Sequence, residues 1–205
     1  MTKKKENLFF KILLVMFAIA FVLSATSNTA ICIKAIINYN HNVVAWGEYN
    51  HEGIISNQND FANLYYGYGN LADNGCGAVS VYNIMCLENK NPYLPKIIRD
   101  FDFWGENLFG LGGSNPLRVM SVLKKNGFKV QFSLNQNKFE NIAKTSKYAI
   151  FLYFGNNGTI FGHYQLMYNF DGEKFDTINL TGKYTYQEIT NIDNLFFTMM
   201  IGVNT

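Results

Sequence analysis

The sequence has few cysteines, few charged residues and no metal-binding or nucleotide-binding motif. Three cysteines in 205 residues do not make a disulfide framework, and without a Cys-x-x-Cys or His-x-x-x-His pair a zinc site is disfavoured. Charged residues make up 16% of the chain, the net charge is +2, and there is no basic stripe, which argues against a nucleic-acid partner. The glycine-rich stretch 110–116 lacks the spacing of a phosphate-binding loop. No metal or organic cofactor is expected.

The N-terminus has the pattern of an export signal. Lysines at 3, 4, 5 and 11 precede the stretch from Ile12 to Leu23, which contains no polar side chain. As a helix this stretch would span about 18 Å, short of the roughly 30 Å of a bilayer core. Residues 1–27 are therefore interpreted as a cleaved signal or, with Leu8 to Phe10 included, an uncleaved anchor. Both place the protein outside the cytoplasm, with membrane contact only through this segment.

The rest of the chain has the length of one domain. Residues 28–60 are expected to be a linker or pro-segment, with strand-like residues from Asn42 to Ile55, and residues 61–205 to be the domain. Three helices are predicted first: Cys76 to Leu87, Leu94 to Glu106, and one that begins at Pro116 and ends at Gly127.

Strands predominate in the second half of the chain. Alternating or continuous apolar runs predict Phe128 to Phe132, Tyr148 to Phe154, His163 to Phe170, Phe175 to Leu180 and Leu195 to Val203, with a short helix from Lys138 to Thr145. Helices followed by antiparallel strands indicate an α+β domain with a cleft between its two layers.

Cys76 is the candidate nucleophile. It lies where a polar turn changes into an apolar helix, and the backbone N–H groups of the first helical turn favour a thiolate and a lowered pKa. Gly75 and Gly77 would leave room for a substrate backbone beside the sulfur. The alternative is that Cys76 is a small buried residue, as Cys86 is expected to be.

His163 is the candidate base, because a cysteine nucleophile needs an imidazole within hydrogen-bond reach. It begins a strand after Gly162, whereas His41 and His51 lie in a polar segment typical of surface histidines. A structural role is the alternative for His163 as well.

Asn179 is the candidate residue that orients His163. A three-residue loop over 170–172 would make paired residue numbers in the hairpin sum to 342 and place Asn179 opposite His163. Asp176 would then lie on the other face. Asn70, six residues before Cys76, could join the Cys76 N–H group in an oxyanion hole. Each asparagine has an alternative as an ordinary strand-end or loop residue.

With these residues in place, the chain resembles the papain-like cysteine peptidases, and among them the double-glycine leader peptidases of bacteriocin processing. The likeness covers roughly residues 69–180. It is carried by Asn70, Cys76-Gly77, Gly113-Ser114, Gly127-Phe128, His163-Tyr164 and Asn179. The resemblance implies a papain-like fold, with an N-terminal helical part that contains the nucleophile helix and packs against an antiparallel sheet. It also implies a Cys76–His163–Asn179 triad with Asn70 at the oxyanion.

Three residues depart from that family. Asn70 replaces a glutamine, Gly75 replaces an aspartate before the nucleophile, and Asn179 replaces the more common aspartate. The leader peptidases are also fused to exporters on the cytosolic side, whereas this chain has its own export signal. The double-glycine cleavage rule is therefore not carried over.

The sequence thus predicts an exported cysteine peptidase that acts on a peptide or protein through an acyl-enzyme. Two alternatives stay open. The same thiol could serve a cell-wall amidase or an acyltransferase, or the cleft could belong to a catalytically inactive peptide-binding surface protein.

Overall fold

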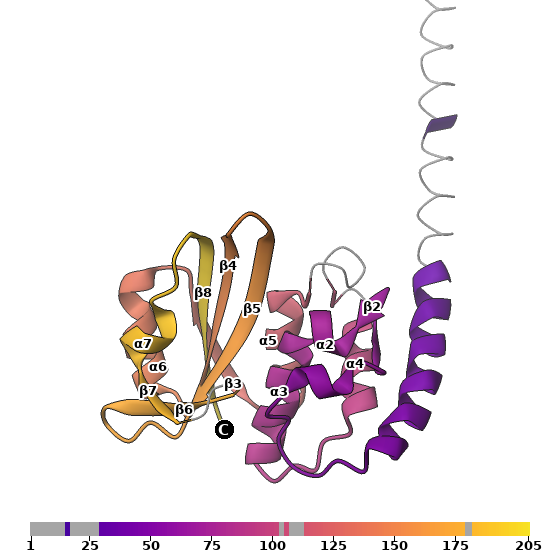
Figure 1. Ribbon diagram of the computed structural model, residues 1–205, viewed down its shortest axis with the longest axis horizontal. Coiled ribbons are helices and arrows are strands. Elements are labelled where there is room, and N and C mark those ends of the chain that lie inside the picture. Colours follow the sequence, from indigo (N-terminus) through magenta and orange to yellow (C-terminus); the bar gives the residue numbers. More distant parts are fainter. Residues whose placement is uncertain (1–14, 17–28, 103–104, 107–112, 179–181) are drawn as a thin grey trace, which may run out of the picture.

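A computed structural model describes residues 15–16, 29–102, 105–106, 113–178 and 182–205. The described part is α+β: the helices before residue 126 gather on one side of a six-stranded antiparallel sheet, and shorter helices lie on its other side (Figure 1). Most of the predicted segment 1–27, together with Trp104 and Asn179, lies outside the described residues. Within the described residues, no helix is both long and apolar enough to span a bilayer.

The helical side opens with a helix over residues 29–49, followed by the 3-10 helix η1 (Gln58–Phe61) and a small β1–β2 hairpin (Tyr65–Tyr66 and Gly69–Asn70). The strand expected between Asn42 and Ile55 is wrong, because that stretch is helical to residue 49. Residues Ala45 and Ile55 are buried in the main core. The stretch expected to be a linker or pro-segment therefore packs on the domain, while its processing stays a prediction.

Three further helices follow much as predicted. A short helix α2 (Leu71–Asn74) leads into α3 (Cys76–Leu87), which has the predicted bounds. Helix α4 (Leu94–Asp102) ends earlier than expected. Helix α5 (Pro116–Lys125) starts as its capping residues indicate, since the Asn115 side chain accepts a hydrogen bond from the Leu117 N–H group.

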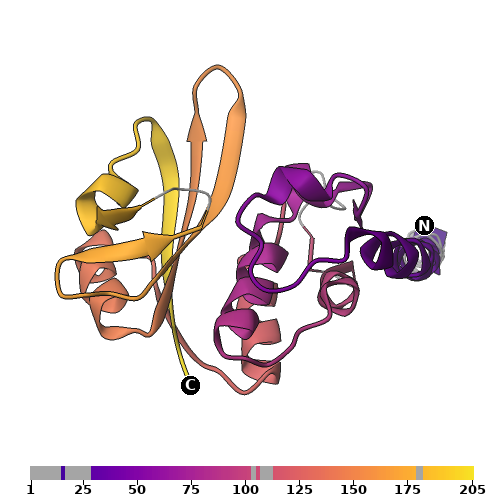
Figure 2. The same ribbon diagram turned by 60° about the horizontal axis from the view of Figure 1, so that its bottom comes forward.

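The sheet has the strand order β3-β8-β4-β5-β6-β7. Its strands are β3 (Lys129–Ser133), β4 (Tyr148–Asn156), β5 (Ile160–Tyr168), β6 (Lys174–Thr177), β7 (Lys183–Thr185) and β8 (Leu195–Asn204). The short helices η3 (Gln136–Lys138), α6 (Phe139–Thr145) and α7 (Tyr186–Thr190) cover the face that points away from the other helices (Figure 2).

Apolar side chains are buried on both faces of this sheet. Alternate residues of the central strands face α3, among them Ile150, Leu152 and Leu166. Their neighbours, such as Phe151 and Met167, pack instead with α6 and α7. The larger core thus joins α3 to β5, and this contact fixes where the start of α3 meets the sheet.

Candidate active site

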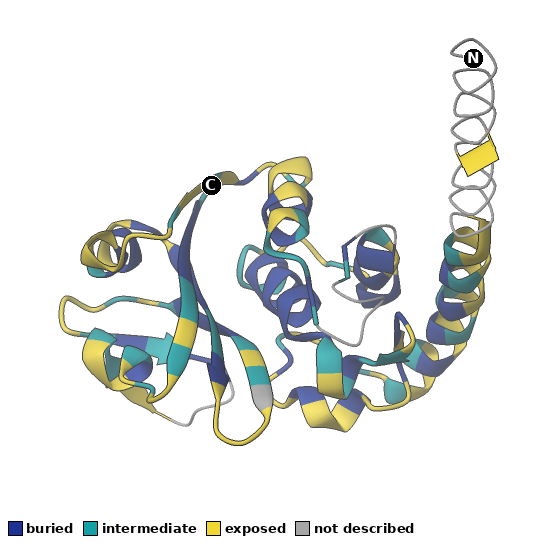
Figure 3. Ribbon diagram, turned by 90° about the horizontal axis from the view of Figure 1, so that it is seen from above, coloured by how far each residue is buried: buried dark blue, intermediate teal, exposed yellow. Residues whose placement is uncertain are grey.

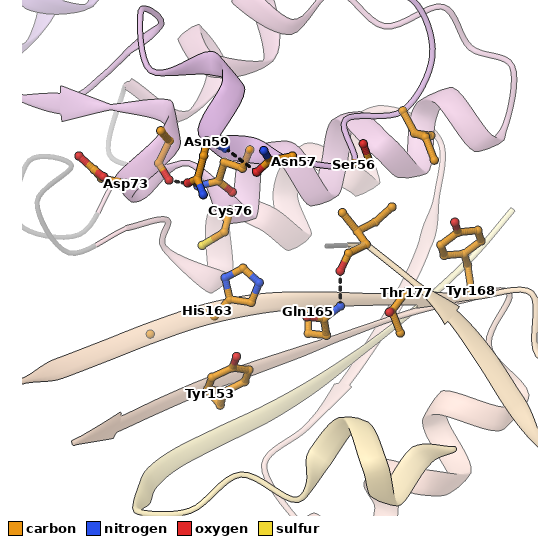
Figure 4. Close-up of a pocket in the computed structure, with 15 residues that line it drawn as sticks. Ser56, Asn57, Asn59, Asp73, Cys76, Tyr153, His163, Gln165, Tyr168 and Thr177 are labelled. Atoms are coloured by element: carbon orange, nitrogen blue, oxygen red, sulfur yellow. Dashed lines mark hydrogen bonds between the residues drawn. The ribbon is translucent and has the colours of Figure 1, made fainter. Parts of the chain in front are cut away.

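Cys76 and His163 lie in one cleft between the two layers. Cys76 is the first residue of α3, and His163 lies on β5, directly paired with Tyr153 of β4. Figure 4 shows the sulfur of Cys76 pointing from α3 toward the imidazole ring. Both residues line a cavity of about 940 Å³. The structure therefore brings together the two residues that the sequence assigned as nucleophile and base.

Burial keeps both groups neutral. It raises the pKa of the Cys76 thiol, although backbone N–H groups of Tyr164, Gly77 and Cys76 act in the opposite direction. It also lowers the pKa of the His163 imidazole. The expectation of a lowered thiol pKa is therefore wrong, because desolvation outweighs the helix start. Both shifts favour the neutral forms, a thiol beside an imidazole that can accept its proton.

The two glycines beside Cys76 serve internal packing. A Cβ on Gly77 would lie 2.5 Å from the Cβ of Ser114, and one on Gly75 would lie 2.2 Å from Leu71 Cδ1. A side chain at either position would clash with these neighbours, so packing within the chain requires both glycines. The expectation that they leave room for a substrate backbone is corrected accordingly.

Ser114 joins the start of α3 to the sheet and to β1. Its hydroxyl lies 2.6 Å from the Tyr66 hydroxyl, and its carbonyl accepts a hydrogen bond of 2.8 Å from the Tyr164 hydroxyl. All three residues are buried. Since Tyr164 follows His163 and Gly77 follows Cys76, this network fixes the start of α3 relative to β5 beside both residues.

Asn70 has a role different from the predicted one. Its side-chain oxygen accepts from the Asp73 N–H group at 2.8 Å and caps α2, and its Nδ2 donates to Asp73 Oδ2 at 2.9 Å. It does not belong to the residues that line the cavity. The amide is thus engaged with Asp73, which leaves the Cys76 N–H group as the described donor suited to an oxyanion.

Replacing Asn70 with alanine tests this correction. We expect a loss of stability of about 1 kcal/mol from the missing cap, and a kcat within about threefold of the wild type, whereas loss of an oxyanion donor costs about 10²–10³-fold. Thermal unfolding and steady-state hydrolysis measure the two effects. Asn70→Ser, which keeps a capping oxygen but no amide, should behave as wild type in both. A hundredfold fall in kcat in both variants would restore the oxyanion role.

The hairpin register differs from the predicted one. Met167 pairs with Thr177 and Tyr168 with Asp176, so paired numbers sum to 344 instead of 342. Asn169 has a φ of 50°, and the Asp171 carboxylate accepts from the N–H groups of Glu173 and Lys174, which lengthens the loop. Asn179 lies outside the described residues, so its role beside His163 stays a prediction.

The sequence reasoning missed the segment 54–59, which forms one wall of the cavity. Asn83 of α3 holds this segment: it accepts from the Ile55 N–H group at 2.8 Å and donates to the Ile55 carbonyl at 2.9 Å. Gln58 Nε2 donates to the carbonyls of Leu71 and Ala72. A lone asparagine within an apolar helix was the available sign that α3 binds another backbone.

The far end of the cavity is formed by the sheet. Gln165 Nε2 donates to the Ile178 carbonyl at 2.7 Å and joins β5 to the segment after β6. Thr177 lines the same cavity, and its buried hydroxyl has no hydrogen-bond partner among the described residues. The described residues contain no group of three or more His, Cys, Asp or Glu side chains that could hold a metal ion.

No protein-family model and no curated protein matches the sequence. Among solved structures, the chain is similar to a double glycine motif protease from an AMS/PCAT transporter in complex with its leader peptide (18% identity, TM-score 0.43, covering 63% of this chain and 84% of that one). It is also similar to the peptidase domain of Streptococcus ComA, a bifunctional ABC transporter of a quorum-sensing pathway (12%, 0.44, 63% and 90%). A third is that domain of Streptococcus mutans ComA with a small-molecule inhibitor (11%, 0.33, 46% and 77%). The structures to which this chain is similar are thus peptidase domains.

Proposed function

We propose that this protein is a cysteine peptidase of the papain-like type. The observation that carries the proposal is the Cys76 thiol at the start of α3, facing the His163 imidazole across a cavity large enough for several residues of a peptide (Figure 4). A thiol and a neutral imidazole in one cleft provide the nucleophile and the proton acceptor that the first step of acyl transfer requires.

In the proposed reaction, His163 accepts the thiol proton while the sulfur of Cys76 attacks the peptide carbonyl. The N–H group of Cys76, at the helix start beside the sulfur, donates to the oxyanion. The imidazolium then protonates the leaving amine, and the acyl-enzyme forms. Water, deprotonated by His163, releases the acid and restores the thiol. Asn179 is proposed to hold the imidazole in the required orientation.

The substrate is proposed to be an extended peptide. Polar residues of the segment 54–59, among them Ser56, Asn57 and Asn59, line the cavity together with Thr177, so the cavity wall is polar enough to bind a peptide. Digestion of a peptide library, followed by mass spectrometry of the new termini, tests this. Wild-type protein should yield discrete cleavage sites that the Cys76→Ala variant does not. Release of peptidoglycan fragments without any peptide cleavage would instead favour the cell-wall amidase.

We further propose that the domain acts outside the cytoplasm. The support is the export-signal pattern at the N-terminus, in which lysines precede the apolar stretch from Ile12 to Leu23. Cys32 is exposed and gives a direct measurement. In a Cys76→Ser, Cys86→Ser background, a membrane-impermeant maleimide should label Cys32 in intact producing cells, whereas the same background with Cys32→Ser should stay unlabelled. Labelling that requires cell lysis would contradict an external location.

A further inference from the structure

The helix over residues 29–49 buries its small and polar residues against the domain. Ala35, Asn38, Asn42 and Ala45 face inward and are at most 6% exposed. Asn38 donates to the Gly67 carbonyl, and Asn42 both accepts from the Tyr65 N–H group and donates to its carbonyl. The contact of this helix with the domain therefore combines these hydrogen bonds with apolar packing of Ala45, Trp46 and Tyr49 near its end.

The opposite side of the same helix exposes large aliphatic residues (Figure 3). We call Ile33, Ile36, Ile37, Asn40, Val43 and Val44 the outer seam. Its aliphatic members are 36–67% exposed. A surface helix ordinarily turns such residues toward the core. Here the arrangement is reversed, which indicates that another surface covers the seam.

The outer seam has the spacing of a coiled-coil contact. Residues 33, 37, 40 and 44 follow one another at intervals of four, three and four, which are the a and d positions of a heptad. Ile36 and Val43 flank them, one heptad apart. The pattern predicts a narrow contact with another helix.

The absence of charge on the outer seam favours another helix, and not a lipid surface, as its partner. The outer seam has no charged residue, and Lys34 points inward over the rings of Tyr65 and Tyr68, at 5.8 and 4.9 Å from their centroids. A helix that lies on a membrane surface presents several lysines or arginines to the headgroups. A charge-free seam is compatible with a second, identical seam, because no like charges would meet.

We propose that the outer seam binds the outer seam of a second copy of this chain, with the two helices parallel. In a parallel pair in register, each aliphatic residue meets its own counterpart and Asn40 meets Asn40, and a single polar residue of this kind fixes register. The helix that carries the seam lies on the far side of the helical layer from the sheet (Figures 1 and 2), and none of its residues lines the cavity, so pairing leaves the cavity open. The proposal does not depend on peptidase activity.

Cysteine cross-linking in the full chain tests this pairing. In a background of Cys32→Ser, Cys76→Ser and Cys86→Ser, Ile33→Cys is expressed in cells, and the membranes and medium are exposed to a mild oxidant. Because the seam holds the two sulfurs together, disulfide-linked dimers should form at least about tenfold faster than for Asn137→Cys, an exposed position on the sheet side. Equal rates at the two positions would overturn the proposal.

A second measurement keeps the native cysteines. Light scattering in detergent should give a mass of two copies for wild type and of one copy for Ile37→Glu, with equal labelling of Cys76 by a thiol-reactive probe in both. A single-copy mass for wild type would overturn the pairing. The pairing would also be overturned if the wild type had a single-copy mass and bound vesicles while Ile37→Glu did not. The seam would then bind lipid.

Discussion

Replacing Cys76 with alanine is expected to lower peptide hydrolysis by about 10⁵-fold or more, since the proposed acyl-enzyme forms on its sulfur. The thiol is buried and small, so the loss of packing should cost only about 1 kcal/mol of stability. Initial rates on a cleaved peptide and thermal unfolding measure the two quantities.

Cys86 provides a matched control on the same helix. It is half-buried, and its thiol donates to the Gly53 carbonyl at 3.4 Å, away from the cavity. Cys86→Ala should lose a similar small amount of stability and keep full activity. If Cys76→Ala remained active, or if both variants were equally inactive while folded, the assignment of the nucleophile would fail.

Replacing His163 with alanine is expected to lower kcat/KM by about 10³-fold or more, because the neutral thiol of Cys76 then has no base to receive its proton. Tyr153→Phe is the control, because Tyr153 pairs with His163 across the two strands, with ring centroids 6.0 Å apart. That variant should stay within a few-fold of wild type. Comparable losses in both variants would indicate a general disturbance of β4 and β5.

The same residue sets the expected pH dependence. Since burial lowers the pKa of His163, the acidic fall of kcat/KM should lie below the ordinary histidine value of about 6.5. Acid protonates the imidazole, which can then no longer accept the thiol proton, and the buried cation also lowers stability as the pH falls. His163→Ala should remove this limb from whatever activity remains.

Alkylation of Cys76 by iodoacetamide distinguishes a neutral pair from a thiolate–imidazolium pair. Because burial raises the pKa of the thiol, the inactivation rate should keep rising above about pH 8.5, the ordinary thiol pKa. A rate already constant at about pH 5 would show that the ion pair forms in the resting protein.

Local sequence patterns correctly predicted the start of those helices that begin with a capping residue or an abrupt change in composition. Asn115 and Pro116 begin α5 where the capping pattern placed it, and α3 starts at Cys76 as the change from polar turn to apolar run indicated. Cys76 and His163 could be singled out as candidates because cysteine and histidine are rare in this chain, and the structure places both in one cleft. Residue spacing along the chain predicted positions less well where side chains form hydrogen bonds with nearby backbone groups.

Two failures of prediction have physical causes. The helix over 29–49 was missed because its aliphatic residues face outward and its inward face holds asparagine and alanine, so the usual sign of burial is reversed. The Asn70 assignment depended on a distance of six residues along the chain, but α2 forms in between and uses Asn70 as its cap. Neither outcome follows from residue type alone.

The position of Ser114 has a consequence for how the cleft can move. One serine ties β1, the first turn of the nucleophile helix and the strand that carries His163, all through buried contacts. This end of the cleft is therefore held more tightly than the opposite end, between the segment 54–59 and Tyr168. We expect a bulky ligand to be accommodated by widening at that opposite end, with Cys76 and His163 kept in place.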